Sequence, residues 1–179
     1  LMMKLAEGVL LHDIGKILID KKILSKPGAL TEEEYEKIKE HPMLGYNLLR
    51  TNSFLSEASR VVALTHHERI DGLGYPYGLT NKELTEFAKI TSIADVYDAL
   101  TSDRCYRPKW TARSAMDYLI EHSGTRFDTE LVALFIQQIA VYPNGCTVRL
   151  STGALGIVER QNQHMPLRPV VRVITDTTG

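Results

Sequence analysis

Residues 66–77 read His-His-Glu-Arg-Ile-Asp-Gly-Leu-Gly-Tyr-Pro-Tyr, two adjacent histidines that lead into a glycine-rich turn. An apolar helical pattern precedes them, so His66 and His67 are expected at the end of a partly buried helix. A buried imidazole is costly unless each ring nitrogen has a partner. A metal ion on one nitrogen and a carbonyl or carboxylate on the other supply both. The stretch therefore indicates a metal site in a helical bundle; the simpler alternative is a solvated helix end with incidental histidines.

Upstream, residues 12–16 read His-Asp-Ile-Gly-Lys. An apolar run before them predicts a helix that carries His12 and Asp13 and ends near Ile19. Neighbouring helical residues point about 100° apart, so the two side chains can share one metal ion, or Asp13 can bridge to a second. Lys16 lies on the same helical face, where its charge suits an anionic phosphate beside a metal. The alternative is an ordinary helix C-terminus, with a glycine as breaker and a lysine facing the dipole.

Two further candidates stand alone in the sequence. Asp95 lies between Ile93 and Val96 in an apolar helical stripe. A carboxylate in such a stripe is nearly always paired, and a metal ion is a suitable partner. His41 precedes Pro42 and, taken by itself, fits a surface residue that closes a helix.

Together these groups offer nitrogen and oxygen ligands but no thiolate, which favours iron, manganese or zinc in a catalytic role. The candidates are His12, Asp13, His41, His66, His67 and Asp95. This set is too large for one catalytic ion that keeps an open position, so we expect at least two ions. A two-metal site activates water and stabilises the attacking and leaving oxygens of a phosphoryl displacement. The residues alone thus predict metal-assisted hydrolysis of a phosphate ester.

Composition limits the class of protein. The chain has 179 residues, 44% of them hydrophobic, and a formal net charge of −1. This balance fits one sizeable domain, with or without a small appendage, and argues against binding to long DNA or RNA. Cys105 and Cys146 lie far apart without metal-ligand or disulfide spacing, so a reduced, cytoplasmic setting is expected. No apolar run reaches the ~18 residues of a membrane span.

The expected fold class is mainly α, a helical bundle with a small C-terminal antiparallel β unit. Thr31 and Glu34 form a capping box at one helix start, and Asp128 caps another helix. Beyond the last helix the sequence changes to short β-branched runs separated by turns, typical of about three strands. We therefore expect a helical catalytic domain at residues 1–141 and a β-rich appendage at residues 142–179.

These motifs resemble the HD-GYP family, a subgroup of the HD metal-dependent phosphohydrolases. The resemblance rests on residues 12–16, on residues 66–76, and on residues 95–104, which read Asp-Val-Tyr-Asp-Ala-Leu-Thr-Ser-Asp-Arg. It covers roughly residues 5–140 and implies an HD-type helical bundle. Members of this family are bacterial enzymes that hydrolyse the second messenger cyclic di-GMP to linear pGpG and in many cases on to GMP.

The resemblance also implies roles for individual residues. The six candidates named above match the metal ligands of the family, which binds two or three divalent ions: iron, manganese or else zinc. Asp13 and Lys16 match catalytic residues, and Lys16, Arg104, Arg107 and Tyr75 match contacts with the substrate. The Gly-Tyr-Pro loop is linked to partner recognition, which implies a diguanylate cyclase domain as a partner. Family members usually carry a sensory or receiver domain ahead of the catalytic one.

The chain departs from the family pattern in several places, two of which are the region upstream of His12 and the position of Cys105. The family takes a further histidine, and in its three-metal members a glutamate, from a helix upstream of the position of His12, and Leu1 lies too close to His12 to include that helix. Cys105 stands where proline is usual. We therefore expect a fragment of a longer protein, and two alternatives stay open. One is a catalytically incomplete module that binds cyclic di-GMP or a diguanylate cyclase. The other is an HD hydrolase for another cyclic dinucleotide, such as cyclic GMP-AMP.

Overall fold

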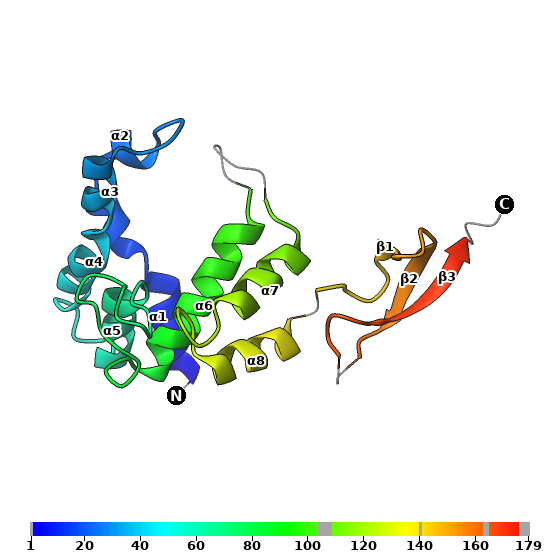
Figure 1. Cartoon of the computed structure of the whole chain (residues 1–179). Helices are drawn as coiled ribbons and strands as arrows, with labels where there is room; N and C mark the ends of the chain where they lie inside the picture. Colours follow the sequence, from blue (N-terminus) through cyan, green and yellow to red (C-terminus); the bar gives the residue numbers. More distant parts are fainter. Residues whose placement is uncertain (1, 104–108, 140, 163–164, 176–179) are drawn as a thin grey trace.

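The structure, a computed structural model, describes residues 2–103, 109–139, 141–162 and 165–175. Its first helices are α1 (Met2–Leu11), the 3-10 turn η1 (Ile14–Leu18), α2 (Lys21–Leu24), α3 (Glu32–Ile38), α4 (His41–Leu49) and α5 (Glu57–Thr65). The longest helix and its two successors are α6 (Glu86–Thr101), α7 (Ala112–Glu121) and α8 (Thr129–Gln138). The prediction of a mainly α fold is confirmed, as Figure 1 shows.

The helices form two groups joined at α6. In the first group α1 packs along α5, and α4 packs against both α5 and η1. In the second group α6, α7 and α8 enclose the main apolar core, which contains Ile93, Met116, Leu119, Phe127 and Val132. Helix α6 also contacts α5, so a side chain on α6 can reach the first group. Figure 1 shows α6 between the two groups.

Two helix starts follow the capping pattern of the sequence. Thr31 accepts a hydrogen bond from the Glu34 backbone while the Glu34 side chain accepts one from the Thr31 backbone, which is the predicted capping box. Asp128 accepts hydrogen bonds from the backbone N–H groups of Glu130 and Leu131 and begins α8. Both predictions are confirmed. Such caps can be predicted because they depend on residues close together in the sequence.

The prediction of one helix that carries His12 and Asp13 and ends near Ile19 is wrong. Helix α1 ends at Leu11, and the chain turns before it enters η1. The reason is a close approach between η1 and α4: a Cβ on Gly15 would overlap the His41 carbonyl oxygen and the backbone nitrogen of the next turn of α4. A continuous helix would not bring η1 against α4, so the long-range contact overrides local helical preference.

The C-terminal strands form the predicted antiparallel sheet. They are β1 (Thr147–Arg149), β2 (Leu155–Arg160) and β3 (Val170–Thr175), in the order β1-β2-β3. Figure 1 shows this sheet beyond the end of α8. Tyr142 and Leu167 pack against the apolar core of the helices and so attach the sheet to them. The division into domains at residues 141 and 142 stays a prediction.

None of the helices in the described ranges combines the length and the apolar character needed to cross a membrane.

Candidate metal centre

The six predicted ligands come from separate elements that meet at one place. They are His12 and Asp13 in the turn after α1, His41 at the start of α4, His66 and His67 directly after α5, and Asp95 within α6. The packing of α1 and α4 on α5, and of α5 on α6, brings these helix ends together.

Asp13 lies at the centre of the group. Its Oδ1 atom is 3.3 Å from His41 Nε2 and 3.8 Å from His66 Nε2. Its Oδ2 atom is 3.4 Å from His12 Nε2. The two oxygens of one carboxylate therefore face different imidazoles.

Asp95 closes the other side of the group. Its Oδ1 atom is 3.7 Å from His12 Nε2, and its Oδ2 atom is 3.8 Å from His67 Nδ1. A tighter subset consists of Asp13, His41, His66 and His67, whose ligand atoms all lie within 4.8 Å of one another. The structure thus brings all six side chains into one cluster, which we call the His/Asp cluster.

Three of the histidines make the same kind of hydrogen bond to the backbone. The Nδ1 atoms of His12, His41 and His66 lie 2.6, 2.6 and 3.0 Å from the carbonyl oxygen three residues earlier. A carbonyl oxygen only accepts, so Nδ1 carries the proton, and Nε2 of the neutral ring keeps its lone pair. Histidines that bind metals are typically oriented by such a carbonyl on their other nitrogen. These rings therefore present a ligand atom to the cluster.

The polar atoms inside the cluster lack enough partners from the protein. His41 and His66 are fully buried, and their Nε2 atoms face each other at 3.2 Å. Among the described residues, His12 Nε2 and Asp13 Oδ1 are buried without a hydrogen-bond partner. Buried polar atoms of this kind are costly unless a further group binds them. A divalent cation would satisfy facing lone pairs and an unpaired carboxylate oxygen, so the donor set fits a metal.

The pKa values of His12, His66 and His67 are shifted in two opposite directions. Burial opposes a charge on His12, but the carboxylates of Asp13 and Asp95 outweigh it and raise the pKa of His12 to about 10. Burial, with the charges of neighbouring histidines, lowers the pKa of His66 to about 4 and that of His67 to about 2. At neutral pH the latter two rings are neutral, which is the form that binds a metal.

The carboxylates are ionised. Burial alone would raise the pKa of Asp13, but His12, His41 and Lys16 hold it far below the usual range. Burial would also raise the pKa of Asp95, but the nearby imidazoles of His12, His66 and His67 together lower it. Ionised carboxylates and neutral imidazoles are together the protonation states required of metal ligands.

The predicted substrate residues lie around the rim. Lys16 Nζ is 2.6 Å from Asp13 Oδ2, and 38% of its side chain is exposed. The Tyr75 ring stacks on His67 with centroids 4.7 Å apart and the planes inclined by 28°. Arg104 and Arg107 lie outside the described residues.

Glu68 is a site residue for which the sequence predicted no role. Its side chain is 2% exposed, and its two carboxylate oxygens accept hydrogen bonds from Tyr77 N at 2.7 Å and Leu79 N at 3.0 Å. The loop also lies directly on the Glu68 backbone, since a Cβ on Gly74 would overlap it. Glu68 therefore fixes the Gly-Tyr-Pro loop, and with it Tyr75, against the cluster. The signal in the sequence was an acidic residue directly after two adjacent histidines.

Comparison with known proteins agrees with this geometry. The family model described as "HD domain" matches residues 2–131, and that described as "KOW domain associated with HD domain" matches residues 147–179. A Pseudomonas aeruginosa protein named a cyclic di-GMP phosphodiesterase is 42% identical over 164 residues, which cover 92% of this chain and 39% of that protein. A Vibrio cholerae protein named 3′3′-cGAMP-specific phosphodiesterase 2 is 38% identical over 128 residues, covering 71% of this chain and 24% of that protein. The chain thus spans less than half the length of these relatives.

A solved structure agrees in fold. A Bdellovibrio bacteriovorus protein described as an HDG"Y"P protein superimposes with a TM-score of 0.56 at 22% identity, covering 73% of this chain and 41% of that one. All six residues of the His/Asp cluster lie within residues 2–131, the range that the HD domain model matches. The chain belongs to the HD domain family, as its resemblance to the HD-GYP group led us to expect.

Proposed function

We propose that this chain is the catalytic part of a metal-dependent phosphodiesterase that hydrolyses cyclic di-GMP. The observation that carries the proposal is the Asp13 carboxylate, whose two oxygens face different imidazoles within one partly buried cluster. A carboxylate in this position would supply one ligand oxygen to each of the two sides of the cluster. Two-metal sites are a common solution for displacement at phosphorus.

The proposed cofactors are two or three divalent ions, iron, manganese or else zinc. Their ligands would be His12, Asp13, His41, His66, His67 and Asp95. Nitrogen and oxygen donors without a thiolate support this choice of metals. When bound, such ions lower the pKa of a water molecule and neutralise charge that develops on the phosphoryl oxygens.

The other proposed roles concern the substrate phosphates. The Lys16 ammonium is half-exposed beside Asp13, so it can exchange its carboxylate partner for a phosphate oxygen as the substrate enters. Asp13 and Lys16 would then act at the reacting phosphate. Arg104 and Arg107 are proposed, from the resemblance, to hold the second phosphate. Tyr75 borders the site from the Gly-Tyr-Pro loop.

Cyclic di-GMP is preferred over cyclic GMP-AMP for one reason. The relative named for cyclic di-GMP matches more of this chain, and at higher identity, than the relative named for 3′3′-cGAMP. The reaction product is proposed to be linear pGpG, with GMP as a further product.

A protein partner is also proposed. Leu73 and Tyr77 in the Gly-Tyr-Pro loop are 74% and 56% exposed, which supports this loop as the contact for a diguanylate cyclase domain. An upstream sensory or receiver domain and a cytoplasmic setting stay predictions from the sequence.

The test is hydrolysis of both cyclic dinucleotides by the same metal-loaded protein, with products separated by chromatography. We expect pGpG or GMP from cyclic di-GMP at a higher kcat/KM than hydrolysis of cyclic GMP-AMP. Faster cleavage of cyclic GMP-AMP would favour the alternative hydrolase. A protein that holds metal and binds cyclic di-GMP but cleaves neither compound would favour the incomplete binding module.

A further inference from the structure

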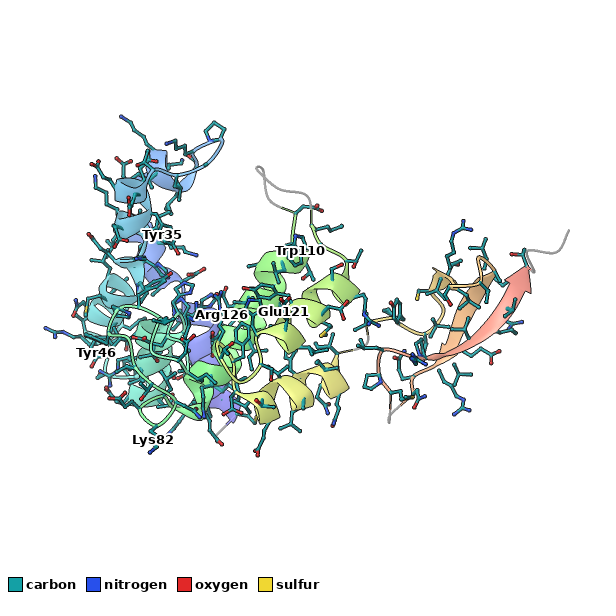
Figure 2. All side chains as sticks on the ribbon, viewed as in Figure 1. Tyr35, Tyr46, Lys82, Trp110, Glu121 and Arg126 are labelled. Atoms are coloured by element: carbon teal, nitrogen blue, oxygen red, sulfur yellow. The ribbon has the colours of Figure 1, made fainter. Side chains whose placement is uncertain are left out.

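The C-terminal turn of α3 carries an aromatic ring and a cation on one face. Tyr35 and Lys39 are four residues apart, so they lie one above the other on the helix surface. Lys39 Nζ lies 5.3 Å from the centroid of the Tyr35 ring, and 47% of Tyr35 is exposed. Figure 2 labels Tyr35 on the part of α3 that leads into α4.

This face is fixed beside the His/Asp cluster. Lys39 Nζ also lies 5.7 Å from the centroid of Tyr75, and the Tyr75 ring in turn stacks on His67. The end of α3 is held in place because the Ile38 carbonyl accepts the Nδ1 hydrogen bond of His41. A row of rings and one ammonium thus leads from the cluster outward: His67, Tyr75, Lys39 and Tyr35.

Folding alone gives little reason for the outer half of this row. Tyr35 is half-exposed and is not part of the main apolar core. Lys39 pairs with Glu36 at 2.6 Å on the same helix, and a pair of this exposed kind contributes little to stability. A half-exposed aromatic ring beside the site of the proposed phosphodiesterase suits stacking with a base. An ammonium next to it suits the O6 and N7 acceptors of guanine.

We propose that Tyr35 and Lys39 form a nucleobase-binding site, in which a guanine of the dinucleotide stacks on Tyr35 and receives a hydrogen bond from Lys39. The inference rests on the proposed phosphodiesterase function and adds to it the residues that recognise a base. Phosphate contacts are left to Lys16 at the cluster, so base and phosphate are bound by different elements.

The experiment compares Tyr35→Ala, Tyr35→Phe and Lys39→Met with two controls. Phe54→Ala removes a ring that is 94% exposed between α4 and α5, and Lys37→Met removes a different exposed charge from α3. Binding of cyclic di-GMP is measured by calorimetry, and kcat and KM are measured for cyclic di-GMP and for methyl p-nitrophenyl phosphate. The second compound is a phosphodiester without a purine.

Tyr35→Ala is expected to raise the Kd and KM for cyclic di-GMP by roughly 5- to 100-fold with little change in kcat, as loss of one base–aromatic stack implies. The ratio of kcat/KM between the two substrates should fall by the same factor. Lys39→Met should lower it too, while Tyr35→Phe keeps the ring and both controls keep the wild-type ratio.

Two results would overturn the inference and leave the phosphodiesterase standing. One is wild-type affinity for cyclic di-GMP in Tyr35→Ala, and the other is an equal loss for both substrates, which would mean general damage to the site. If the unmodified protein neither binds nor cleaves cyclic di-GMP, the proposed function and this inference both fail.

Discussion

At the residue scale, the position of each ring nitrogen determines the chemistry of the cluster. The carbonyl groups that accept from Nδ1 direct the Nε2 atoms of His41 and His66 towards each other as acceptors, 3.2 Å apart. Acceptors that face one another repel unless a cation lies between them. The protein therefore holds a site whose unfavourable electrostatics are relieved by metal binding.

Asp13→Ala tests this arrangement most simply. This change removes the carboxylate that faces His12 on one side and His41 on the other. It should lower the amount of bound metal and reduce hydrolysis of cyclic di-GMP by more than about 100-fold. That loss exceeds the usual cost of removing a group that only supports a metal ligand. Metal content and turnover are measured on one sample. Asp117→Ala is the control, since Asp117 pairs with Arg113 on the surface of α7. Full metal and full turnover in Asp13→Ala would refute the assignment.

Glu68→Gln tests the anchoring of the Gly-Tyr-Pro loop. Glu68 now accepts hydrogen bonds from the backbone N–H groups of Tyr77 and Leu79. The amide of Gln has only one oxygen, so its NH2 group would face one of these two donors. Leaving a buried donor unpaired costs about 1–3 kcal/mol. We expect this loss in the free energy of unfolding measured with urea, together with faster proteolysis in the loop. Glu33→Gln, at an exposed position in α3, should change neither; unchanged stability in Glu68→Gln would argue against the anchor.

At the scale of elements, local signals were predictable and long-range contacts were not. The helix starts at Thr31 and Asp128 follow from residues within one turn, and the sequence predicted both. The turn that carries His12 and Asp13 was predicted as helix, because the close approach of Gly15 to α4 depends on residues far along the chain. The ligands were recognised by residue type, whereas their distances follow from how the helices pack.

The sequence did not reveal the other site residues for the same reason: their contacts depend on long-range packing. Glu68 acts through a loop that folds back on it, and Tyr35 and Lys39 meet Tyr75 only after α3 and that loop are in place. An exposed tyrosine and lysine one turn apart are common on helix surfaces, so the sequence alone gave them no special role.

Asp128 offers a pH test of one element. It caps α8, and its Oδ2 atom lies 3.2 Å from Lys89 Nζ. Burial would raise the pKa of Asp128, but the Leu131 N–H and Lys89 lower it below its usual value. Because the pKa is lower in the folded state, the stabilisation is complete above about pH 4 and is lost as pH falls further.

Asp128→Ala should therefore reduce the free energy of unfolding at pH 7 by about 0.5–2 kcal/mol, as loss of a helix cap implies. Urea denaturation at pH 7 and pH 3 measures it, and the difference from wild type should shrink at the lower pH. Asp128→Asn keeps a capping oxygen without the charge, so it should lose less at pH 7. An Asp128→Ala effect that grows on acidification would contradict the account.

At the scale of the whole molecule, the helices carry the site and the sheet is attached to them. All six predicted ligands lie at or before Asp95, while Tyr142 and Leu167 connect the strands to the apolar core. The Gln161 amide also donates to the Tyr142 carbonyl at 2.7 Å. The sheet is thus expected to support stability more than metal binding.

Deleting residues 147–179 tests that division. We expect the same metal content per chain, retained helical circular dichroism, and a melting temperature lower by roughly 2–8 °C, because the contact of Leu167 with the core is lost. Leu167→Ala in the full chain should account for part of the shift. Loss of metal on deletion would show that the sheet belongs to the site.

The central claim is that the His/Asp cluster is a metal centre that cleaves cyclic di-GMP. The most direct measurement is metal content by mass spectrometry on anaerobically purified protein, with cyclic di-GMP turnover assayed on the same sample. The account predicts two or more divalent ions per chain, and turnover that disappears when a chelator removes them and returns when iron or manganese is restored. Protein that turns over cyclic di-GMP without bound metal, or that holds its metals and never cleaves it, would contradict the account.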